Sequence, residues 1–281
     1  PRREKNDVSE YYESDHIHVK AIVAQDYSWE HSHWQADRSL AQWLDEEKIT
    51  GIYGIDTRAL TKHLRERGSM LGKIIVDDCE DVDWYDPNKE NLVAKVSCTK
   101  VEEFGTGDKT VVLIDCGVKH NIIRCLTRRG VHVVMVPWDY DFTTIHYDGL
   151  FISNGPGNPD MAETTVGNIR KAIALGKPIC GICMGNQLLS KAAGASTYNL
   201  KSGPRSHNQP VRRAGTDTCF VTSQNHGYAV DSNTIPDEWE PLFINMNDGT
   251  NEGIRHKSKP FFSAQFHPEA SSGPKDTEFL F

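Results

Sequence analysis

The feature that most constrains the fold is a regular alternation of strand-like and helix-like segments in the second part of the chain. The segments are, in order, strand 111–115, helix 119–129, strand 131–136, strand 150–153, helix 166–175, strand 178–182 and helix 184–193. This alternation predicts an α/β fold with a mainly parallel sheet covered by helices on both faces. Ligand sites in such sheets lie beyond the carboxyl ends of the strands, so the loops after 150–153 and 178–182 are the first places to look for chemistry.

A polar, glycine-rich stretch over 102–109 separates this part from an amino-terminal part with a different pattern. The amino-terminal segments are strand 19–23, helix 38–47, helix 57–67 and strand 73–76. This mixture predicts a smaller α+β domain. We therefore expect two domains, over residues 1–104 and 109–281.

The composition excludes several kinds of partner. Acidic residues number 39 against 31 basic ones, and a net charge of -8 gives no support for nucleic acid or an anionic membrane as a partner. No apolar stretch approaches the roughly 18 residues of a membrane span, and no signal peptide is evident, so we expect a cytoplasmic protein. The seven cysteines, an odd number, indicate reduced thiols rather than a disulfide framework. No pattern of Cys, His, Asp and Glu predicts a metal site.

Cys183 is the strongest candidate for a chemical role. It follows an apolar strand, precedes a helix and has a glycine two positions away on either side, which matches the Gly-x-nucleophile-x-Gly elbow. A sharp strand-to-helix turn needs neighbours without side chains, and the helix amino terminus favours the reactive thiolate. The alternative is a buried structural cysteine in a glycine-flanked turn.

Cys180 forms a Cys-x-x-Cys pair with Cys183, a pattern that also occurs in redox and metal sites. However, Cys180 falls inside the expected strand, and no second pair completes a four-thiolate site. We expect Cys180 to have a packing role.

A candidate base for the thiol follows the apolar segment 260–266. His267 and Glu269 are two residues apart, and in an extended chain such residues face the same way. Glu269 could therefore orient the imidazole and stabilise its cation. A lone histidine near the end of a strand is usually structural, so the pair indicates chemistry only together with Cys183.

The loop after strand 150–153 carries Gly155 and Gly157, whose lack of side chains would let main-chain N–H groups approach a ligand. An oxyanion hole is one interpretation of this loop. A plain proline-glycine turn is the other.

Taken together, these motifs resemble those of the class I (triad) glutamine amidotransferases. The three motifs are Ser-Asn-Gly-Pro-Gly-Asn-Pro at 153–159, Gly-Ile-Cys-Met-Gly-Asn-Gln at 181–187 and Phe-His-Pro-Glu at 266–269. Nearly the whole chain is similar to the small, glutaminase subunits of carbamoyl-phosphate synthetase. The segments that carry this narrower resemblance are 55–61, 115–122, 207–210, 223–230 and 247–253.

The resemblance implies a role for each residue of the site. Cys183 would attack the glutamine carboxamide, His267 would transfer protons and Glu269 would orient His267. Main-chain N–H groups of Gly157 and Met184 would hold the oxyanion. The glutamine pocket would be lined by Gly155, Gly157, Met184, Gln187, Asn225, Gly227 and Tyr228.

The resemblance also implies a partner. Ammonia released from L-glutamine would reach a large synthetase subunit, which uses bicarbonate and ATP with Mg to make carbamoyl phosphate for arginine and pyrimidine synthesis. The chain itself would need no cofactor. Departures from the family pattern are Asn186, where many relatives carry histidine, and ends that suggest truncation of the amino-terminal domain and loss of a closing helix.

Two alternatives remain open at this stage. One is the glutaminase component of another amidotransferase, such as that of guanylate or anthranilate synthesis, against which the first hundred residues argue. The other is a catalytically silent, regulatory glutaminase-like domain.

Overall fold

The structure, a computed structural model, describes residues 8–36, 38–77, 79–270 and 275–281. The chain forms two compact units. The smaller contains Ser14–Trp84, and the larger contains Tyr85–Phe281 together with the described residues that precede Ser14.

The smaller unit is a short α+β arrangement. Its elements are β1 (Ala21–Val23), α1 (Leu40–Glu46), β2 (Thr50–Ile52) and α2 (Thr57–Arg67), with β1 and β2 paired in parallel. Ser39 and Gln42 form a capping box at the start of α1, which satisfies amide groups that the first helical turn leaves unpaired. The prediction of a strand at 73–76 is wrong. Among the described residues, the sheet of this unit consists of β1 and β2, and residues 73–76 do not pair with either strand.

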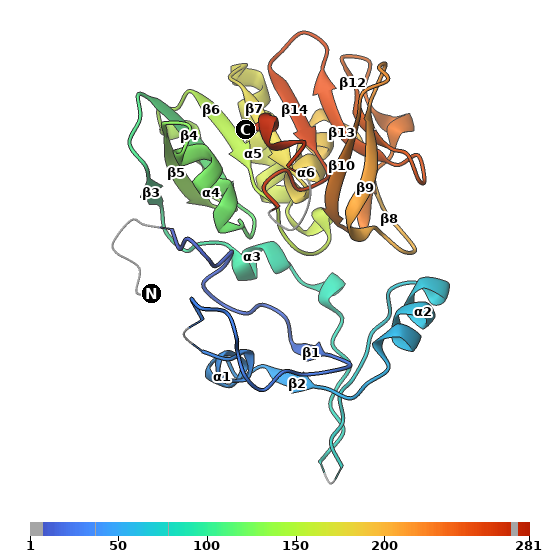
Figure 1. Ribbon diagram of the computed structural model, residues 1–281. Helices are drawn as coiled ribbons and strands as arrows, with labels where there is room; N and C mark the ends of the chain where they lie inside the picture. The colour runs from blue at the N-terminus through green and yellow to red at the C-terminus, as the bar shows by residue number, and fades with distance from the viewer. Residues whose placement is uncertain (1–7, 37, 78, 271–274) are drawn as a thin grey trace. The chain divides into compact units, whose positions relative to one another are not determined.

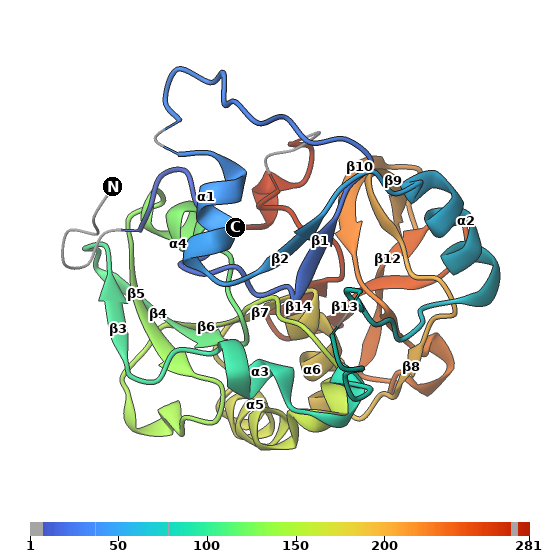
Figure 2. The same cartoon turned by 90° about the horizontal axis from the view of Figure 1, so that it is seen from below.

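The larger unit contains one mixed sheet with helices on both faces (Figures 1 and 2). Its elements are α3 (Leu92–Val96), β3 (Glu102–Phe104), β4 (Lys109–Asp115), α4 (His120–Thr127), β5 (Val131–Pro137), β6 (Gly149–Ile152), α5 (Glu163–Leu175), β7 (Ile179–Ile182), α6 (Met184–Ala193), β8 (Thr197–Asn199), β9 (Arg205–Arg213), β10 (Cys219–Asn225), β11 (Tyr228–Val230), β12 (Trp239–Asn245), β13 (Asn251–His256) and β14 (Phe261–Ala264).

The strand order is β10-β9-β12-β13-β14-β7-β6-β4-β5-β3, which can be followed across Figure 2, and β11 pairs with β13 and β8. Neighbours from β14 to β5 are parallel, whereas β3 and the strands from β13 to β10 are antiparallel. The seven predicted elements of the parallel part are confirmed within a few residues. The sheet is therefore an α/β core extended at one side by antiparallel strands.

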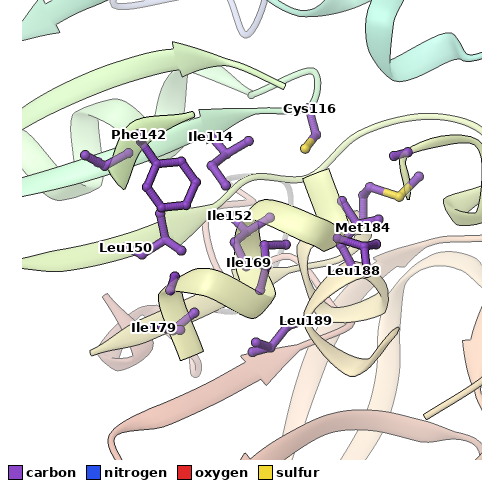
Figure 3. Packing of buried hydrophobic residues seen from close by; sticks show 14 of the residues in the cluster. Ile114, Cys116, Phe142, Leu150, Ile152, Ile169, Ile179, Met184, Leu188 and Leu189 are labelled. Carbon is purple, nitrogen blue, oxygen red and sulfur yellow. The ribbon is translucent and has the colours of Figure 1, made fainter. Parts of the chain in front are cut away.

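Alternate residues of the central strands pack on opposite faces of the sheet. Val112 and Ile114 join a core with α5 and α6, part of which is seen in Figure 3, while Leu113 packs with residues of α4. A strand that is buried on both faces needs a continuous apolar run, which explains the pattern seen in the sequence.

The division into compact units falls before Tyr85 rather than at the glycine-rich stretch. Two contacts explain this difference from the expected boundary at 104–109. Val93 of α3 is buried in the core of the larger unit, and β3 pairs with β5 at the edge of the sheet. The segment between Tyr85 and Phe104 is thus part of the frame that carries the site.

We predict that Ile169→Ala destabilises the larger unit by about 2–5 kcal/mol, because it opens a cavity at a fully buried position of α5. Leu175→Ala in the same helix, at a residue that is 54% exposed, should cost about 0.5 kcal/mol or less. Urea unfolding followed by circular dichroism measures both variants. Equal losses would contradict the assignment of Ile169 to the core.

Candidate active site

Cys183 sits at a strained turn between β7 and α6. Its backbone has φ 54° and ψ -103°, a positive φ that few residues other than glycine adopt. The residue is the N-cap of α6, which begins at Met184. Such strain in a chain persists only where the surroundings impose it, and it is common at functional sites.

The glycines of this turn are required by close backbone packing. A Cβ atom at Gly181 would lie 2.5 Å from the carbonyl oxygen of Gly185, and one at Gly185 would lie 2.2 Å from the carbonyl oxygen of Ile152. Neither position can accept a side chain, because the obstacle is main chain. The start of α6 is thus pressed against β6 and β7, and this contact holds Cys183 in its strained conformation.

His267 and Glu269 form a buried pair beyond the end of β14. The imidazole Nδ1 lies 2.7 Å from Glu269 Oε1, and the two side chains are 5% and 1% exposed. The backbone N–H of His267 donates to the carbonyl of Ser223 at 2.9 Å, which anchors the residue to β10. Because a carboxylate only accepts, Nδ1 carries a proton and Nε2 is left for the thiol of Cys183.

The charges of the site favour a thiolate and an imidazolium. Burial alone would raise the pKa of the Cys183 thiol, but the charge and hydrogen bond of His267, with smaller effects of His226 and Lys119, lower it below its ordinary value. Burial also opposes the charge on His267, yet Glu269 and Cys183 raise its pKa to about 9. A cysteine with a depressed pKa beside a charged histidine is ready to act as a nucleophile.

Lys119 is a residue of the site for which the sequence indicated no chemical role, because it stood out only as part of the segment 115–122 and as the start of a helix. Its Nζ lies 3.5 Å from Glu269 Oε1 and 3.4 Å from His267 Nδ1. Burial alone would raise the pKa of Glu269, but His267 and, to a smaller extent, Lys119 lower it below its ordinary value. This ammonium group therefore helps keep the carboxylate ionised.

The loop after β6 is tied to the turn that carries Lys119. The Ser153 hydroxyl accepts from the N–H of Cys116 at 2.9 Å, and Asn154 Oδ1 accepts from the N–H of Lys119 at 3.1 Å. Gly157 has φ +90°, and a Cβ atom at Gly155 would lie 2.1 Å from the carbonyl oxygen of Cys116. The two glycines are thus demanded by conformation and by contact, as the motif indicated.

A cleft of about 670 Å³ opens onto the pair of His267 and Glu269. Its other walls come from the turn around Lys119 and from β9 and β10. Both signs of charge line it, which suits a small zwitterion. The lining residues are Glu13, Lys119, Arg205, Ser206, His207, Ser223, Gln224, Asn225, His267, Glu269 and Ala270.

The remaining pocket candidates lie on the first turns of α6 and around the start of β11. The Gln187 amide is buried and donates to the carbonyl of Tyr228 at 3.1 Å and to Gln265 Oε1 at 3.2 Å. Asn225 ends β10, and Gly227 directly precedes β11.

Cys180 lies in β7, inside a strand as expected, and burial raises the pKa of its thiol.

Asn186 occupies a polar interior rather than the cleft. Its Nδ2 donates to Gln265 Oε1 at 2.9 Å and its Oδ1 accepts from the Ser263 hydroxyl at 2.7 Å. The same Gln265 oxygen accepts a hydrogen bond from Gln187 Nε2, so Asn186 helps hold the residue that orients Gln187.

Among the residues that the structure describes, no group of three or more His, Cys, Asp or Glu side chains is arranged to hold a metal ion. No helix in this part of the chain has the length and apolar character that crossing a membrane requires.

This site combines a nucleophile elbow with a buried cysteine, histidine and glutamate, and it defines a triad amidotransferase. The family described as "Glutamine amidotransferase class-I" matches residues 112–281, and "Carbamoyl-phosphate synthase small chain, CPSase domain" matches residues 5–74. The chain belongs to the carbamoyl-phosphate synthase small-chain family, whose carboxy-terminal domain is a class I glutamine amidotransferase.

Three relatives illustrate the similarity. The arginine-specific small chain of carbamoyl phosphate synthase from Saccharomyces cerevisiae is 48% identical over 99% of this chain and 71% of its own length. The human mitochondrial carbamoyl-phosphate synthase [ammonia] is 51% identical over 98% of this chain, which spans 18% of that relative's length. A solved structure from Thermoplasma acidophilum, described as part of a GMP synthase, covers 61% of this chain and 90% of its own, with 26% identity and a TM-score of 0.53.

We predict that Cys183 reacts first among the seven thiols with a glutamine-like electrophile near pH 7, because its pKa is lowered. Burial raises the pKa of Cys98 to about 12 and also raises that of Cys116, so both should react slowly. Mass spectrometry of the adducts measures the order of labelling, with the exposed Cys219 as an internal reference. Labelling of Cys219 ahead of Cys183 would count against the assignment.

Proposed function

We propose that this chain hydrolyses L-glutamine to glutamate and ammonia. The observation that carries the proposal is the arrangement of Cys183 at a strained elbow, with a lowered thiol pKa, beside a His267 that Glu269 holds in one orientation. In this proposal Cys183 is the nucleophile, His267 transfers protons and Glu269 orients His267.

The reaction follows in two steps. The Cys183 thiolate attacks the side-chain carbonyl carbon of glutamine, and the oxyanion accepts hydrogen bonds from the N–H groups of Gly157 and Met184. The C–N bond then breaks as the His267 imidazolium gives its proton to the departing nitrogen, which leaves ammonia and a thioester. Water next attacks the thioester, His267 takes its proton, and the C–S bond breaks to release glutamate and the thiolate.

We propose that the residues around the Cys183 turn bind glutamine. The cleft beside His267 includes Asn225 and has charges of both signs, which supports binding of an amino acid. The remaining contacts proposed for the pocket are Gly155, Gly157, Met184, Gln187, Gly227 and Tyr228. Met184 and Gln187 lie on the first turn of α6, so binding and chemistry would share one rigid element.

We further propose that the ammonia passes to a synthetase partner that binds ATP and Mg and forms carbamoyl phosphate for arginine or pyrimidine synthesis. The printed names of the relatives support this, since they include an arginine-specific small chain and a carbamoyl-phosphate synthase of much greater length. Copurification of an ATP-using synthetase, or its presence on the same polypeptide, tests the proposal. All seven cysteines are free, which fits a reducing compartment, and we propose the cytoplasm.

A catalytically silent domain is the main rival. The human relative, which is 51% identical in sequence, has ammonia in its name. Sequence identity over the whole chain therefore does not distinguish a chain that uses glutamine from one that does not. The presence of Cys183 in a reactive setting favours the active form. The amino-terminal match to the carbamoyl-phosphate synthase small chain favours that pathway over the guanylate one.

We predict that Cys183→Ala lowers glutamine hydrolysis by at least about a thousandfold, because the variant lacks the thiol that is positioned beside His267 to form the thioester. Cys219→Ala, which removes an exposed thiol, should hydrolyse glutamine at the normal rate. Ammonia release measures both. A wild-type chain without activity in the presence of its synthetase partner, or an active Cys183→Ala variant, would overturn the proposed function.

We predict that Glu269→Gln moves the alkaline limb of kcat/KM to lower pH. Burial lowers the pKa of His267, but the carboxylate and Cys183 together raise it to about 9, so removal of the carboxylate lets the imidazolium lose its proton at lower pH and leaves no acid for the departing ammonia. The measurement is kcat/KM for glutamine from pH 6 to 10. Glu278→Gln, which removes the partner of Arg129 at the surface, is the control and should keep the wild-type limb. An unchanged limb in Glu269→Gln would contradict the role given to Glu269.

A further inference from the structure

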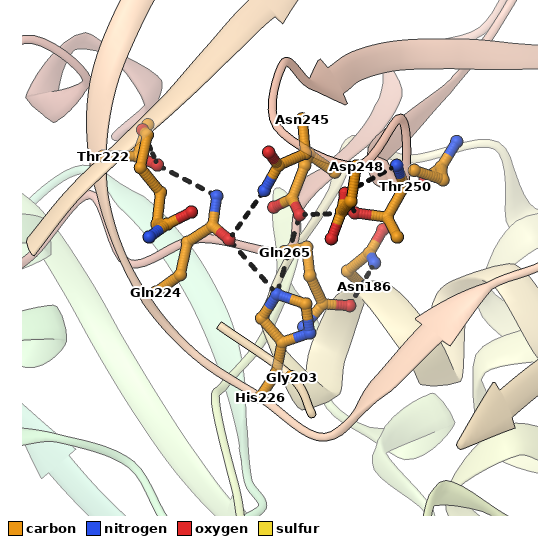
Figure 4. Close-up of polar contacts among 12 residues, drawn as sticks. Asn186, Gly203, Thr222, Gln224, His226, Asn245, Asp248, Thr250 and Gln265 are labelled. Carbon is orange, nitrogen blue, oxygen red and sulfur yellow. Dashed lines mark hydrogen bonds and ion pairs between the residues drawn. The ribbon is translucent and has the colours of Figure 1, made fainter. Parts of the chain in front are cut away.

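A second buried histidine–glutamate pair lies near the first. His226 follows β10 and Glu252 belongs to β13, and their side chains are 1% and 0% exposed. The imidazole Nε2 lies 3.6 Å from Glu252 Oε1. Figure 4 shows His226 inside a network of amide and hydroxyl groups. None of the steps written above for glutamine hydrolysis uses this pair.

The orientation of the surrounding amides follows from a main-chain group. The N–H of Asn247 donates to Asn245 Oδ1 at 2.8 Å, so the other end of that amide is its NH₂ group. Asn245 Nδ2 in turn donates to Gln224 Oε1 at 3.2 Å, and Gln224 Nε2 donates to the Thr222 hydroxyl at 3.1 Å. The atom of Gln224 that faces His226 is therefore an oxygen.

Both ring nitrogens of His226 face acceptors. Nδ1 lies 2.9 Å from the carbonyl oxygen of Tyr228, and Nε2 lies 3.4 Å from Gln224 Oε1. A neutral imidazole has one N–H group and would leave one of these contacts without a proton. The doubly protonated ring satisfies both contacts, and Glu252 supplies the opposite charge within the same network.

We infer that His226 is held as a permanent cation by Glu252 and acts as a positioning residue, a fixed positive charge that stabilises the Cys183 thiolate and shapes the turn from Asn225 to Tyr228. This inference rests on the proposed function for its biological meaning. It adds a second source of thiolate stabilisation, one that does not take part in proton transfer.

The pKa shift of His226 agrees with the geometry of its two ring nitrogens. Burial disfavours charge on His226, but Glu252, Cys183 and the Tyr228 carbonyl raise the pKa of the ring above its ordinary value. His226 is in turn one of the groups that lower the pKa of Cys183, after burial and His267 have been counted. The pKa of Glu252 is raised above its ordinary value, because burial outweighs the opposing effects of His226 and Asn245, so the charge on the carboxylate depends on its contact with the imidazolium.

Other charged groups face the pair from neighbouring elements. His226 is tied to the first turn of α6, which follows Cys183, because the Tyr228 carbonyl oxygen that lies 2.9 Å from its Nδ1 also accepts from Gln187 Nε2 at 3.1 Å. Cys183 raises the pKa of His226, Lys119 and His267 act on Cys183, and Asp248 raises the pKa of Glu252. Asp248 Oδ1 accepts from the N–H and the hydroxyl of Thr250, whose hydroxyl also lies 3.3 Å from Glu252 Oε1. The chemical alternative to an ion pair is a neutral pair, in which Glu252 keeps the proton.

The turn itself leaves His226 little freedom. Its N–H donates to the carbonyl of Pro204 at 3.3 Å, and a Cβ atom at Gly203 would lie 1.8 Å from its carbonyl oxygen. The ring and the backbone are therefore fixed from two sides. A fixed charge costs no reorganisation when the nucleophile acts.

The first arm of the test observes the ring in the complete chain without substitution. ¹⁵N NMR of histidine-labelled protein should give His226 the pair of ring shifts of an imidazolium, unchanged from pH 6 to 9. Absence of the assigned signal in His226→Gln identifies the resonance, and through-bond correlations identify it if that variant does not fold. Shifts of a neutral ring would overturn the inference.

The second arm measures the rate at which iodoacetamide alkylates Cys183 as a function of pH. Glu252→Gln and the double variant His226→Gln with Glu252→Gln should move the midpoint upward, with rates about three- to tenfold lower below it, since a neutral network loses the charge while it keeps hydrogen bonds. Glu240→Gln, which removes the partner of Arg255 at the surface, should keep the wild-type midpoint.

Folded variants with the wild-type midpoint would overturn the inference. Neither arm needs glutamine, so failure of the inference and failure of the proposed function are distinguishable. A chain that never hydrolyses glutamine could still show the imidazolium and the shifted midpoint.

Discussion

The site depends on a contact between main chains. The first turn of α6 lies so close to β6 and β7 that Gly181 and Gly185 leave no room for a Cβ atom. This packing forces Cys183 into a positive φ and directs the helix amino terminus at its position. The sheet supplies the stability for this arrangement, since the strands below the turn are buried on both faces. A strained residue persists because many ordinary contacts around it are satisfied.

Burial of charge is the second constraint. Cys183, His267 and Glu269 are all nearly inaccessible, and an isolated charge at any of them would be costly. The cost is reduced by the neighbours, since Glu269 supports His267, His267 supports the thiolate and Lys119 supports Glu269. The site is thus an alternating set of charges in which each member depends on the next, so removing one affects all the others.

The sequence predicted the parallel half of the sheet because that half has long, uniform apolar runs. It also indicated Cys183, His267 and Glu269, because glycine spacing and strand ends have direct steric and directional meaning. The antiparallel strands β9, β10, β12 and β13 escaped prediction, since their alternation is mixed with polar residues that face the cleft and the interior network. The His226–Glu252 pair escaped for a similar reason. Residues 26 apart come together only through the register of β11 against β13, which no local pattern encodes.

Adjacent strands of one sheet carry the two reacting side chains. Cys183 follows β7 and His267 follows β14, and these strands pair in parallel with Ala264 opposite Ile182. The spacing of thiol and imidazole is therefore set by strand separation, a dimension that is nearly invariant among proteins. Insertions and deletions in the surrounding loops can alter what the cleft accepts without disturbing that spacing. The same property makes the pair a poor point for control, since the spacing of the two side chains cannot change unless the sheet itself shifts.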